Sequence, residues 1–251
     1  MANNQGAYFM AKKDYFLLLD TETTQHSKEY RSMVADFGAI IIDRKGREYA
    51  RCAVLVAGIY GEIPLFYSSD PQDNVFGKHT LDQRYQAYQK MLDSGQRMLA
   101  SVNAINIWLA KAKEKYNPIL TAYNLAFDRD KCLNTHIDLS LFDKSFCLWY
   151  AAVEKWAKTK KYREFVLHLH EFGARTDLGN MTYKTNAETM ARFILGNPDL
   201  PDEPHTALED AIYYELPILK ALVKNTPKKK WLNPLPYNWR DFQIKDWYTV
   251  K

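Results

Sequence analysis

An apolar run that ends in two acids, residues 15–22, constrains the fold of this chain more than any other segment. Its first five residues, YFLLL, are typical of a buried central strand. Side chains alternate between the two faces of a strand, so Asp20 and Glu22 share one face while Thr21 lies on the other. Two carboxylates held this close repel each other and gain protons unless a cation neutralises them. The segment therefore predicts a divalent metal, bound by oxygen ligands at the open edge of a sheet.

Composition narrows the class of protein. The chain has 251 residues and is 47% hydrophobic, which is enough for one large domain with a core of its own. No apolar stretch approaches the ~20 residues that cross a bilayer, and the first residues lack the layout of a signal peptide. Cys52, Cys132 and Cys147 form no CxxC pair, so we expect reduced thiols and neither disulfides nor structural zinc. These features predict a cytoplasmic protein without a membrane partner.

Alternating strand and helix patterns after the first strand predict an α/β fold with a mixed sheet covered by helices. Residues 58–78 are rich in glycine and proline and are typical of a long loop. Pro217 is expected to kink or interrupt the last helix. The predicted strands lie at 34–42, 49–57, 119–123 and 144–148. The predicted helices run from Met98 to before Asn117, over 126–137, from the end of the 144–148 strand through 157, over 185–196 and from after 204. Thr185 and Glu188 are expected to form a capping box at the start of the 185–196 helix.

Two further acids stand near predicted helix starts, Asp128 in TAYNLAFD and Asp210 in HTALED. Taken singly, each acid has an ordinary interpretation, as a first-turn residue that complements the helix dipole or as a solvated side chain. Asp20 and Glu22 can likewise cap a neighbouring helix. All four acids together with His205 are poorly explained in this way, which favours a common site.

The segments LDTETT, TAYNLAFD and HTALED resemble the three motifs of the DEDDh 3′-to-5′ exonucleases, the family that includes the proofreading subunit of bacterial DNA polymerase III. The resemblance covers residues 15 to 224 and keeps the family's order of motifs. It implies a ribonuclease H-like fold, with a five-stranded mixed sheet flanked by helices. The exonuclease domain would occupy residues 1–225, with an inserted loop and helices at about 58–116, and a basic aromatic tail would follow at 226–251.

The same resemblance assigns roles to single residues. Asp130 and Glu209 are acidic neighbours of two motif positions and are less suitable ligands, because the family spacing falls on Asp128 and Asp210. The implied roles are metal ligands for two Mg²⁺ or Mn²⁺ ions at Asp20, Glu22, Asp128 and Asp210, a general base at His205, a backbone N–H for the terminal sugar at Thr23, and an orienting side chain at Asn124.

These residue types suit phosphodiester hydrolysis on chemical grounds. Two divalent ions ~3.5–4 Å apart can generate a hydroxide and hold the leaving oxygen, and carboxylates suit Mg²⁺ or Mn²⁺. Neutral imidazole, with an unperturbed pKa of ~6.5, can accept a proton from the attacking water. We therefore predict a metal-dependent 3′-to-5′ exonuclease that releases mononucleotides from single-stranded nucleic acid, with DNA favoured over RNA.

Two other functions remain open at this point. A ribonuclease T-like or oligoribonuclease-like enzyme would use the same five residues and differ in its contacts with the 2′-hydroxyl. A non-catalytic adaptor would instead dock on a polymerase or bind nucleic acid without cutting it. Candidate partners are therefore single-stranded DNA or RNA 3′ ends, a polymerase, and a second copy of the chain.

Three features lie outside the motif pattern. Gln25 stands where many family members have glycine, which can alter the entrance for the 3′ end. His168 and His170 can bind a metal but lack a third nearby ligand, which favours an ordinary surface pair. The tail combines residues 228–231 (KKKW) with later tryptophans, in a chain of net charge +4. Such a mixture either binds single strands through charge and stacking or packs its rings onto the domain.

Overall fold

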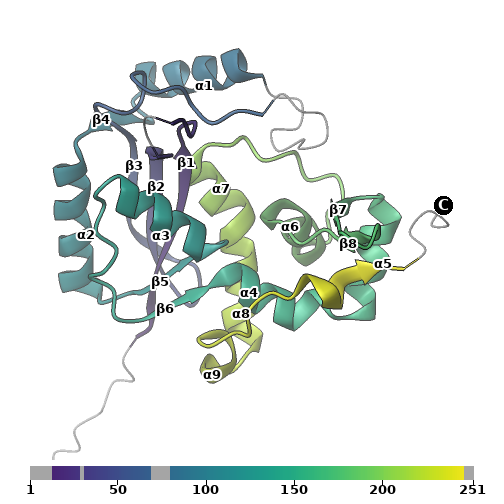
Figure 1. The fold of residues 1–251 in the computed structure, drawn as a ribbon. Helices are drawn as coiled ribbons and strands as arrows, with labels where there is room; N and C mark the ends of the chain where they lie inside the picture. Colours follow the sequence, from purple (N-terminus) through teal and green to yellow (C-terminus); the bar gives the residue numbers. More distant parts are fainter. Residues whose placement is uncertain (1–12, 29–30, 69–79, 246–251) are drawn as a thin grey trace, which may run out of the picture.

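The computed structural model describes residues 13–28, 31–68 and 80–245, which form an α/β fold (Figure 1). A mixed sheet with the strand order β4-β3-β2-β1-β5-β6 lies between two layers of helices. The pairs β1–β2 and β2–β3 are antiparallel, and the pairs β1–β5, β5–β6 and β3–β4 are parallel. The strands are β1 (Tyr15–Thr23), β2 (Val34–Asp43), β3 (Glu48–Val56), β4 (Met98–Ala100), β5 (Ile119–Ala122) and β6 (Ser145–Cys147). The predictions for the N-terminus, for loop residues 69–78 and for Trp247 lie outside the described ranges.

The α/β class and the mixed sheet are confirmed, but the sheet has six strands where five were predicted. The added strand, β4, pairs with residues 54–56 of β3 and includes Met98, which was predicted to begin a helix. Helix α2 (Val102–Tyr116) begins later, because the Ser101 side chain accepts a hydrogen bond from the Ala104 N–H and caps it there. The four-residue spacing from Met98 to Val102 is helical in sequence but crosses this cap.

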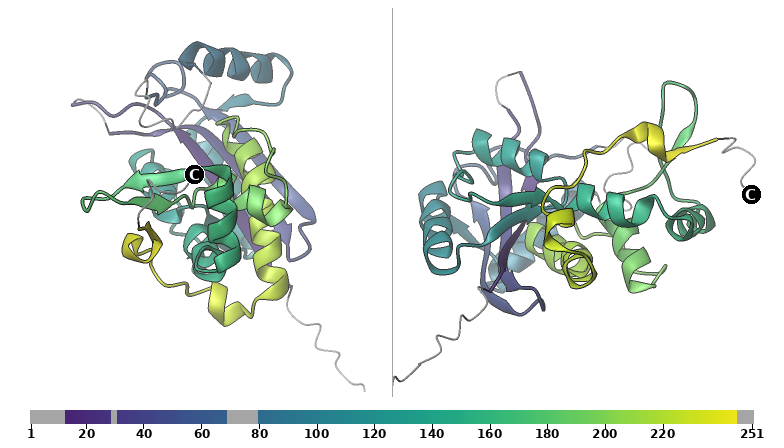
Figure 2. Two further views of the ribbon diagram at one scale, coloured as in Figure 1. Left: turned by 90° about the vertical axis from the view of Figure 1, so that its right-hand side faces the viewer. Right: turned by 90° about the horizontal axis from the view of Figure 1, so that it is seen from below.

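Side chains alternate along β1 and give the sheet two buried faces. Phe16 and Leu18 belong to a core that is formed with α4, α6 and α8, whereas Leu17 and Leu19 belong to a core formed with α1, α2 and α3. Figure 2 shows the sheet between these helical layers. No helix within the described ranges is both long and apolar enough to span a membrane. The helices before the tail are α1 (Leu81–Asp93), α2, α3 (Leu125–Asn134), α4 (Leu148–Ala152) with the π-helical turn η1 (Val153–Ala157), α5 (Lys160–Leu169), α6 (Ala187–Leu195), α7 (Ala207–Asp210) with the π-helical turn η2 (Ala211–Glu215), and α8 (Leu216–Asn225).

The start of α6 differs from its prediction. Asn186 is the N-cap, and its side chain accepts a hydrogen bond from the Thr189 N–H, so the capping box of Thr185 and Glu188 is wrong. Thr185 is engaged elsewhere, because its hydroxyl accepts a hydrogen bond from the Trp149 indole N–H at 3.1 Å. The hydrogen bond with Trp149 therefore occupies the Thr185 hydroxyl that the local sequence predicts to cap the helix.

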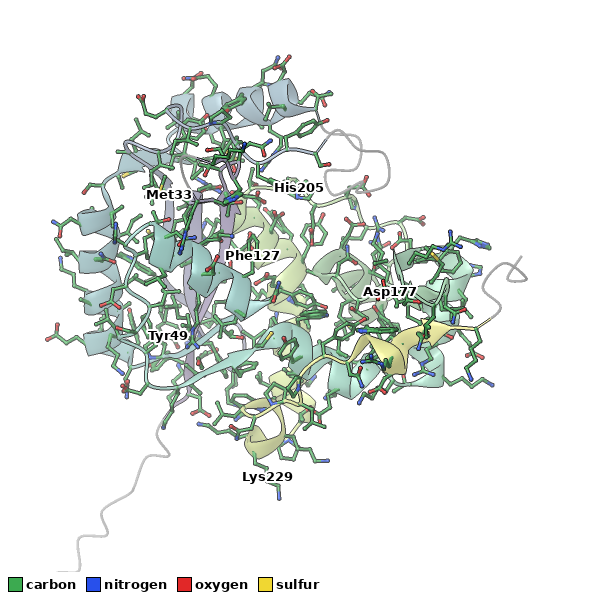
Figure 3. All side chains as sticks on the ribbon, in the orientation of Figure 1. Met33, Tyr49, Phe127, Asp177, His205 and Lys229 are labelled. Carbon is green, nitrogen blue, oxygen red and sulfur yellow. The ribbon has the colours of Figure 1, made fainter. Side chains whose placement is uncertain are left out.

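The predicted tail packs on the domain as far as residue 245. A second sheet of β7 (Phe172–Arg175), β8 (Met181–Tyr183) and β9 (Gln243–Ile244) was not predicted. Trp231, at the end of α9 (Lys228–Trp231), is fully buried against Phe16 and Phe146. Lys229 on the same helix is exposed and lies far from His205 (Figure 3). Residues 239–242 form a short 3₁₀ turn, η3 (Trp239–Phe242), that leads into β9.

Candidate active site

Strand β1 presents two acids on the face that is covered by α7 and α8. Asp20 lies opposite Gly38 of β2 and Glu22 lies opposite Asp36. Because Phe16 and Leu18 belong to that core, the alternation predicted from the sequence is confirmed, and Thr21 lies on the other face.

Gly38 allows the segment that carries Asp210 to approach the strand closely. A Cβ atom at Gly38 would lie 2.2 Å from the Leu208 nitrogen and 2.4 Å from the Ala207 carbonyl carbon, so only glycine fits without a shift. The start of α7 is also held by Asp36, whose Oδ2 accepts a hydrogen bond from the Ala207 N–H at 2.9 Å. These contacts place Asp210 beside the acids of β1.

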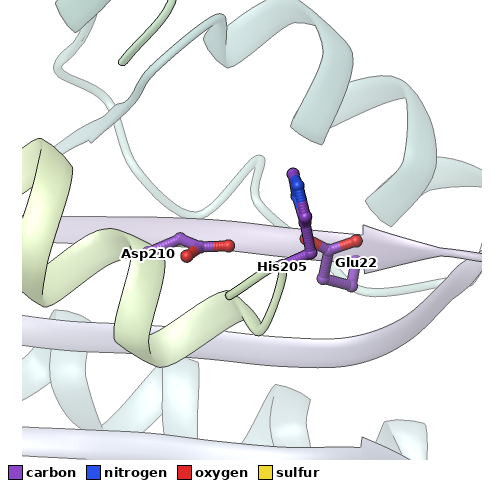
Figure 4. A group of neighbouring side chains, drawn as sticks. All are labelled: Glu22, His205 and Asp210. Atoms are coloured by element: carbon purple, nitrogen blue, oxygen red, sulfur yellow. The ribbon is translucent and has the colours of Figure 1, made fainter. Parts of the chain in front are cut away.

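Glu22, His205 and Asp210 converge at one point. Each offers a ligand atom, and these atoms all lie within 4.8 Å of one another. Figure 4 shows the Asp210 carboxylate pointing along β1 toward the other two side chains. The His205 Nδ1 lies 3.9 Å from the Glu22 Oε1. The group opens into a cavity of about 480 Å³ that Asp20 also lines.

The remaining predicted residues take different positions. Asn124 lines the cavity at the start of α3, with a left-handed φ of 72°. Asp128 does not line it, because its Oδ1 accepts a hydrogen bond from the Thr21 hydroxyl at 2.9 Å and it is 1% exposed. Thr23 is also buried outside the cavity, and its carbonyl accepts a hydrogen bond from the Phe66 N–H. The structure thus brings together Asp20, Glu22, His205, Asp210 and Asn124, with Asp128 close behind β1.

Two cavity acids, Glu203 and Glu215, were not predicted. Glu215 follows Asp210 by five residues, which in an α-helix places it about 140° around the axis from Asp210. The intervening turn η2 is π-helical, and its wider hydrogen-bonded ring brings both acids into the same cavity. A π turn is not readable from this sequence, although Pro217, which lacks an N–H, lies just after it. The helical segment is not interrupted at Pro217, because α7, η2 and α8 follow one another without a break and Pro217 lies in the first turn of α8.

The carboxyl groups raise one another's pKa values. Burial raises the pKa of Glu203 to about 8, with further contributions from Glu188 and Glu22. Burial also raises the pKa of Asp128 to about 7, against the hydrogen bond from Thr21. The pKa values of Asp20, Asp210 and Glu215 are raised in the same way, first by burial and then by neighbouring carboxylates. The cavity therefore favours either protons or an added cation.

Two buried arginines balance part of this charge. The Arg84 Nη2 lies 2.7 Å from the Glu22 Oε2. Burial raises the pKa of Glu22 to about 7 although the charge of Arg84 lowers it. Arg97 pairs with Asp36 and with Glu209, so Glu209 is an ion-pair partner and does not line the cavity. Neither arginine has a sequence signal that would distinguish it from a surface residue of an amphipathic segment.

The donor set fits a divalent cation. Asp210 Oδ1 and Glu215 Oε2 are buried and accept no hydrogen bond from the described residues. Unpartnered carboxylate oxygens are costly in a protein interior, and hard oxygen ligands are those that Mg²⁺ and Mn²⁺ prefer. Glu22 also keeps one oxygen, Oε1, on the side of His205 while Arg84 holds the other. Glu22, His205 and Asp210 thus offer ligand atoms within 4.8 Å of one another, and Arg84 need not leave Glu22 for a cation to bind there.

Comparison with known proteins does not assign the chain to a family. No protein-family model matches it, and no curated protein matches it significantly. Function is therefore inferred from the geometry and chemistry of the cavity.

Proposed function

We propose that this protein is a metal-dependent 3′-to-5′ exonuclease that releases mononucleotides from single-stranded nucleic acid, with DNA favoured over RNA. One observation carries the proposal: Glu22, Asp210 and His205 meet within 4.8 Å in a cavity that Asp20 also lines. Carboxylates beside an imidazole are the groups that metal-assisted phosphodiester hydrolysis requires.

The arrangement of the sheet supports a ribonuclease H-like fold. Three antiparallel strands, β3, β2 and β1, continue into the parallel strands β5 and β6, as the family likeness implies. The free thiols of Cys52, Cys132 and Cys147 favour a reducing, cytoplasmic setting.

Each residue has a separate task in this proposal. Asp20, Glu22 and Asp210 would hold Mg²⁺ or Mn²⁺, and Asp128 would support them from behind β1. The bound ions would neutralise phosphate charge and make water more acidic. His205 would accept the proton of the attacking water, since its side chain lies among the ligands and is 13% exposed.

The cavity wall suits a nucleotide. Trp149, Tyr123 and Phe127 line it beside Asn124, and Phe127 is 44% exposed. Exposed aromatic rings stack on bases without strong sequence preference, whereas amide side chains orient polar edges. A cavity of about 480 Å³ has the volume of typical small-ligand sites and suits a terminal nucleotide.

Matched 5′-labelled single-stranded DNA and RNA oligomers of one sequence test the proposal directly. With Mg²⁺ or Mn²⁺ we expect a ladder that shortens from the 3′ end, faster on DNA, and no products after chelation. Asp20→Asn and His205→Ala should each abolish the ladder. Faster cleavage of RNA would favour the ribonuclease alternative, and tight binding without product release under either metal would favour the non-catalytic adaptor.

A further inference from the structure

Helix α1 lies in the inserted segment and contains none of the three motifs, yet its Arg84 side chain contacts Glu22, which lines the cavity. The guanidinium is 1% exposed. Its Nη2 lies 2.7 Å from the Glu22 Oε2 and donates to the His205 carbonyl at 3.2 Å. Its Nη1 donates to the Phe66 carbonyl at 2.7 Å. One side chain thus joins a proposed metal ligand, the backbone of the proposed base and the loop that contains Phe66.

Tyr88 holds the same carbonyl. It follows Arg84 by four residues, so both side chains lie on one face of α1. The Tyr88 hydroxyl donates to the His205 carbonyl at 3.3 Å, and Tyr88 is fully buried. His205 has a φ of +54°, in the left-handed region that residues other than glycine seldom adopt. Two donors on its carbonyl fix the peptide in this conformation.

Arg97 supports the same segment from its other end. It pairs with Glu209, next to Asp210, and with Asp36, which accepts the Ala207 N–H. Arg84 and Arg97, which both lie in the inserted segment, therefore hold residues 205–210 at both ends. These contacts differ from ordinary packing, because each one involves a proposed functional residue or a residue that contacts or adjoins the segment carrying one.

We propose that Arg84 is a positioning residue of this site: its guanidinium fixes the His205 segment and balances the charge of Glu22 before any cation binds. The inference rests on the proposed function for the role of His205, whereas the balance of charge at Glu22 does not depend on the reaction. It also assigns a task to the inserted helix, which becomes part of the active site.

The two parts of this role have opposite effects on binding and rate. A positive charge beside Glu22 repels an incoming divalent cation, so its removal should strengthen metal binding at a pH where Glu22 is ionised in both proteins and no proton competes with the cation. The same removal releases the His205 carbonyl and should slow the proton transfer that depends on the placement of the imidazole. A residue with a merely structural role would weaken both when it is replaced.

Four variants of the full chain separate these effects. Arg84→Met removes charge and hydrogen bonds, whereas Arg84→Lys keeps the charge but not the planar fork. Tyr88→Phe removes a hydroxyl that contacts His205 and does not touch Glu22. Tyr85→Phe is the matched control on α1, since its hydroxyl accepts the Leu65 N–H outside the cavity. Calorimetric titration of chelator-treated protein with Mn²⁺, together with kcat and KM on a single-stranded oligomer, gives the readouts.

We expect Arg84→Met to bind Mn²⁺ about tenfold more tightly while its kcat falls at least ~tenfold with little change in KM. Arg84→Lys should keep the parent's Mn²⁺ affinity and lose kcat. Tyr88→Phe should keep the Mn²⁺ affinity and lose ~fivefold in kcat, the effect of one hydrogen bond. Tyr85→Phe should match the parent in both.

Unchanged or weaker Mn²⁺ binding by a folded Arg84→Met protein would overturn the charge role. If Arg84→Met does not fold, the other two variants test the positioning role. Tyr88→Phe tests the hydrogen bonds to the His205 carbonyl, and Arg84→Lys tests the need for a planar guanidinium. Unchanged kcat in both variants would overturn the positioning role. Mn²⁺ binding is measured without substrate, so tighter binding by Arg84→Met supports the inference even if the parent releases no nucleotide. An inactive parent contradicts the proposed function alone.

Discussion

Without a bound cation, this protein should become less stable as the pH rises from about 5 to about 8. The cause is the cluster of buried and half-buried carboxyls, among which Glu203 has a pKa of about 8 and Glu22 and Asp128 have pKa values of about 7. Carboxyls in an unfolded chain titrate near pH ~4. The folded chain therefore holds these protons more tightly than the unfolded chain does.

The sign of the effect follows from this difference. A raised pKa contributes stability that is fully present below the unfolded pKa and is lost as pH rises through the folded pKa. A rise for Glu203 from 4.5 to about 8 is equivalent to on the order of 5 kcal/mol, at about 1.4 kcal/mol per pKa unit. Because neighbouring acids share protons, we expect a total loss of at least ~3 kcal/mol in the free energy of unfolding.

Urea unfolding of chelator-treated protein at about pH 5, 6.5 and 8 measures this loss, and a parallel series with Mg²⁺ tests its cause. Mg²⁺ should restore stability at the highest pH and have little effect at the lowest, where protons occupy the oxygens. Asp43 does not contribute in this window: burial favours its protonation, but hydrogen bonds from Lys13 and from backbone N–H groups bring its pKa to about 2.

Glu203→Gln is the matched control, since it removes the group with the highest of the three pKa values and leaves all four motif acids in place. We expect its unfolding free energy to depend less on pH than that of the parent. If the metal-free parent is equally or more stable at about pH 8 than at about pH 5, the carboxyl pKa values are not raised in the folded chain, and the reasoning is refuted.

Three further predictions concern single positions. Gly38→Ala should destabilise the fold by about 1–3 kcal/mol and weaken Mn²⁺ binding, because its Cβ displaces the start of α7, as unfolding and calorimetry would show. Asp20→Asn should keep the parent's far-ultraviolet circular dichroism but lose at least ~10²-fold in nuclease rate, and retained activity would contradict its role. Trp231→Ala should cost about 3–5 kcal/mol in urea unfolding, and a smaller loss would show that the tail is not part of the core.

The placement of two acids on β1 could be predicted from the sequence because strand alternation is local. The apolar residues before Asp20 specify burial, and the period of two specifies which side chains share a face. The same local logic failed where tertiary contacts compete for a side chain. Thr185 offers a cap, but the Trp149 indole uses its hydroxyl, and Asn186 caps the helix instead.

The sequence by itself determined the α/β class, the face that Asp20 and Glu22 share, and the residues that were expected to meet them. Only the tertiary structure decided which of these residues line the cavity, because that depends on contacts between distant segments. Gly38 admits α7 to the sheet, a π turn brings Glu215 beside Asp210, and Arg84 reaches Glu22 from a helix 62 residues further along the chain. Periodicity describes one segment at a time, whereas these contacts depend on how close two backbones approach.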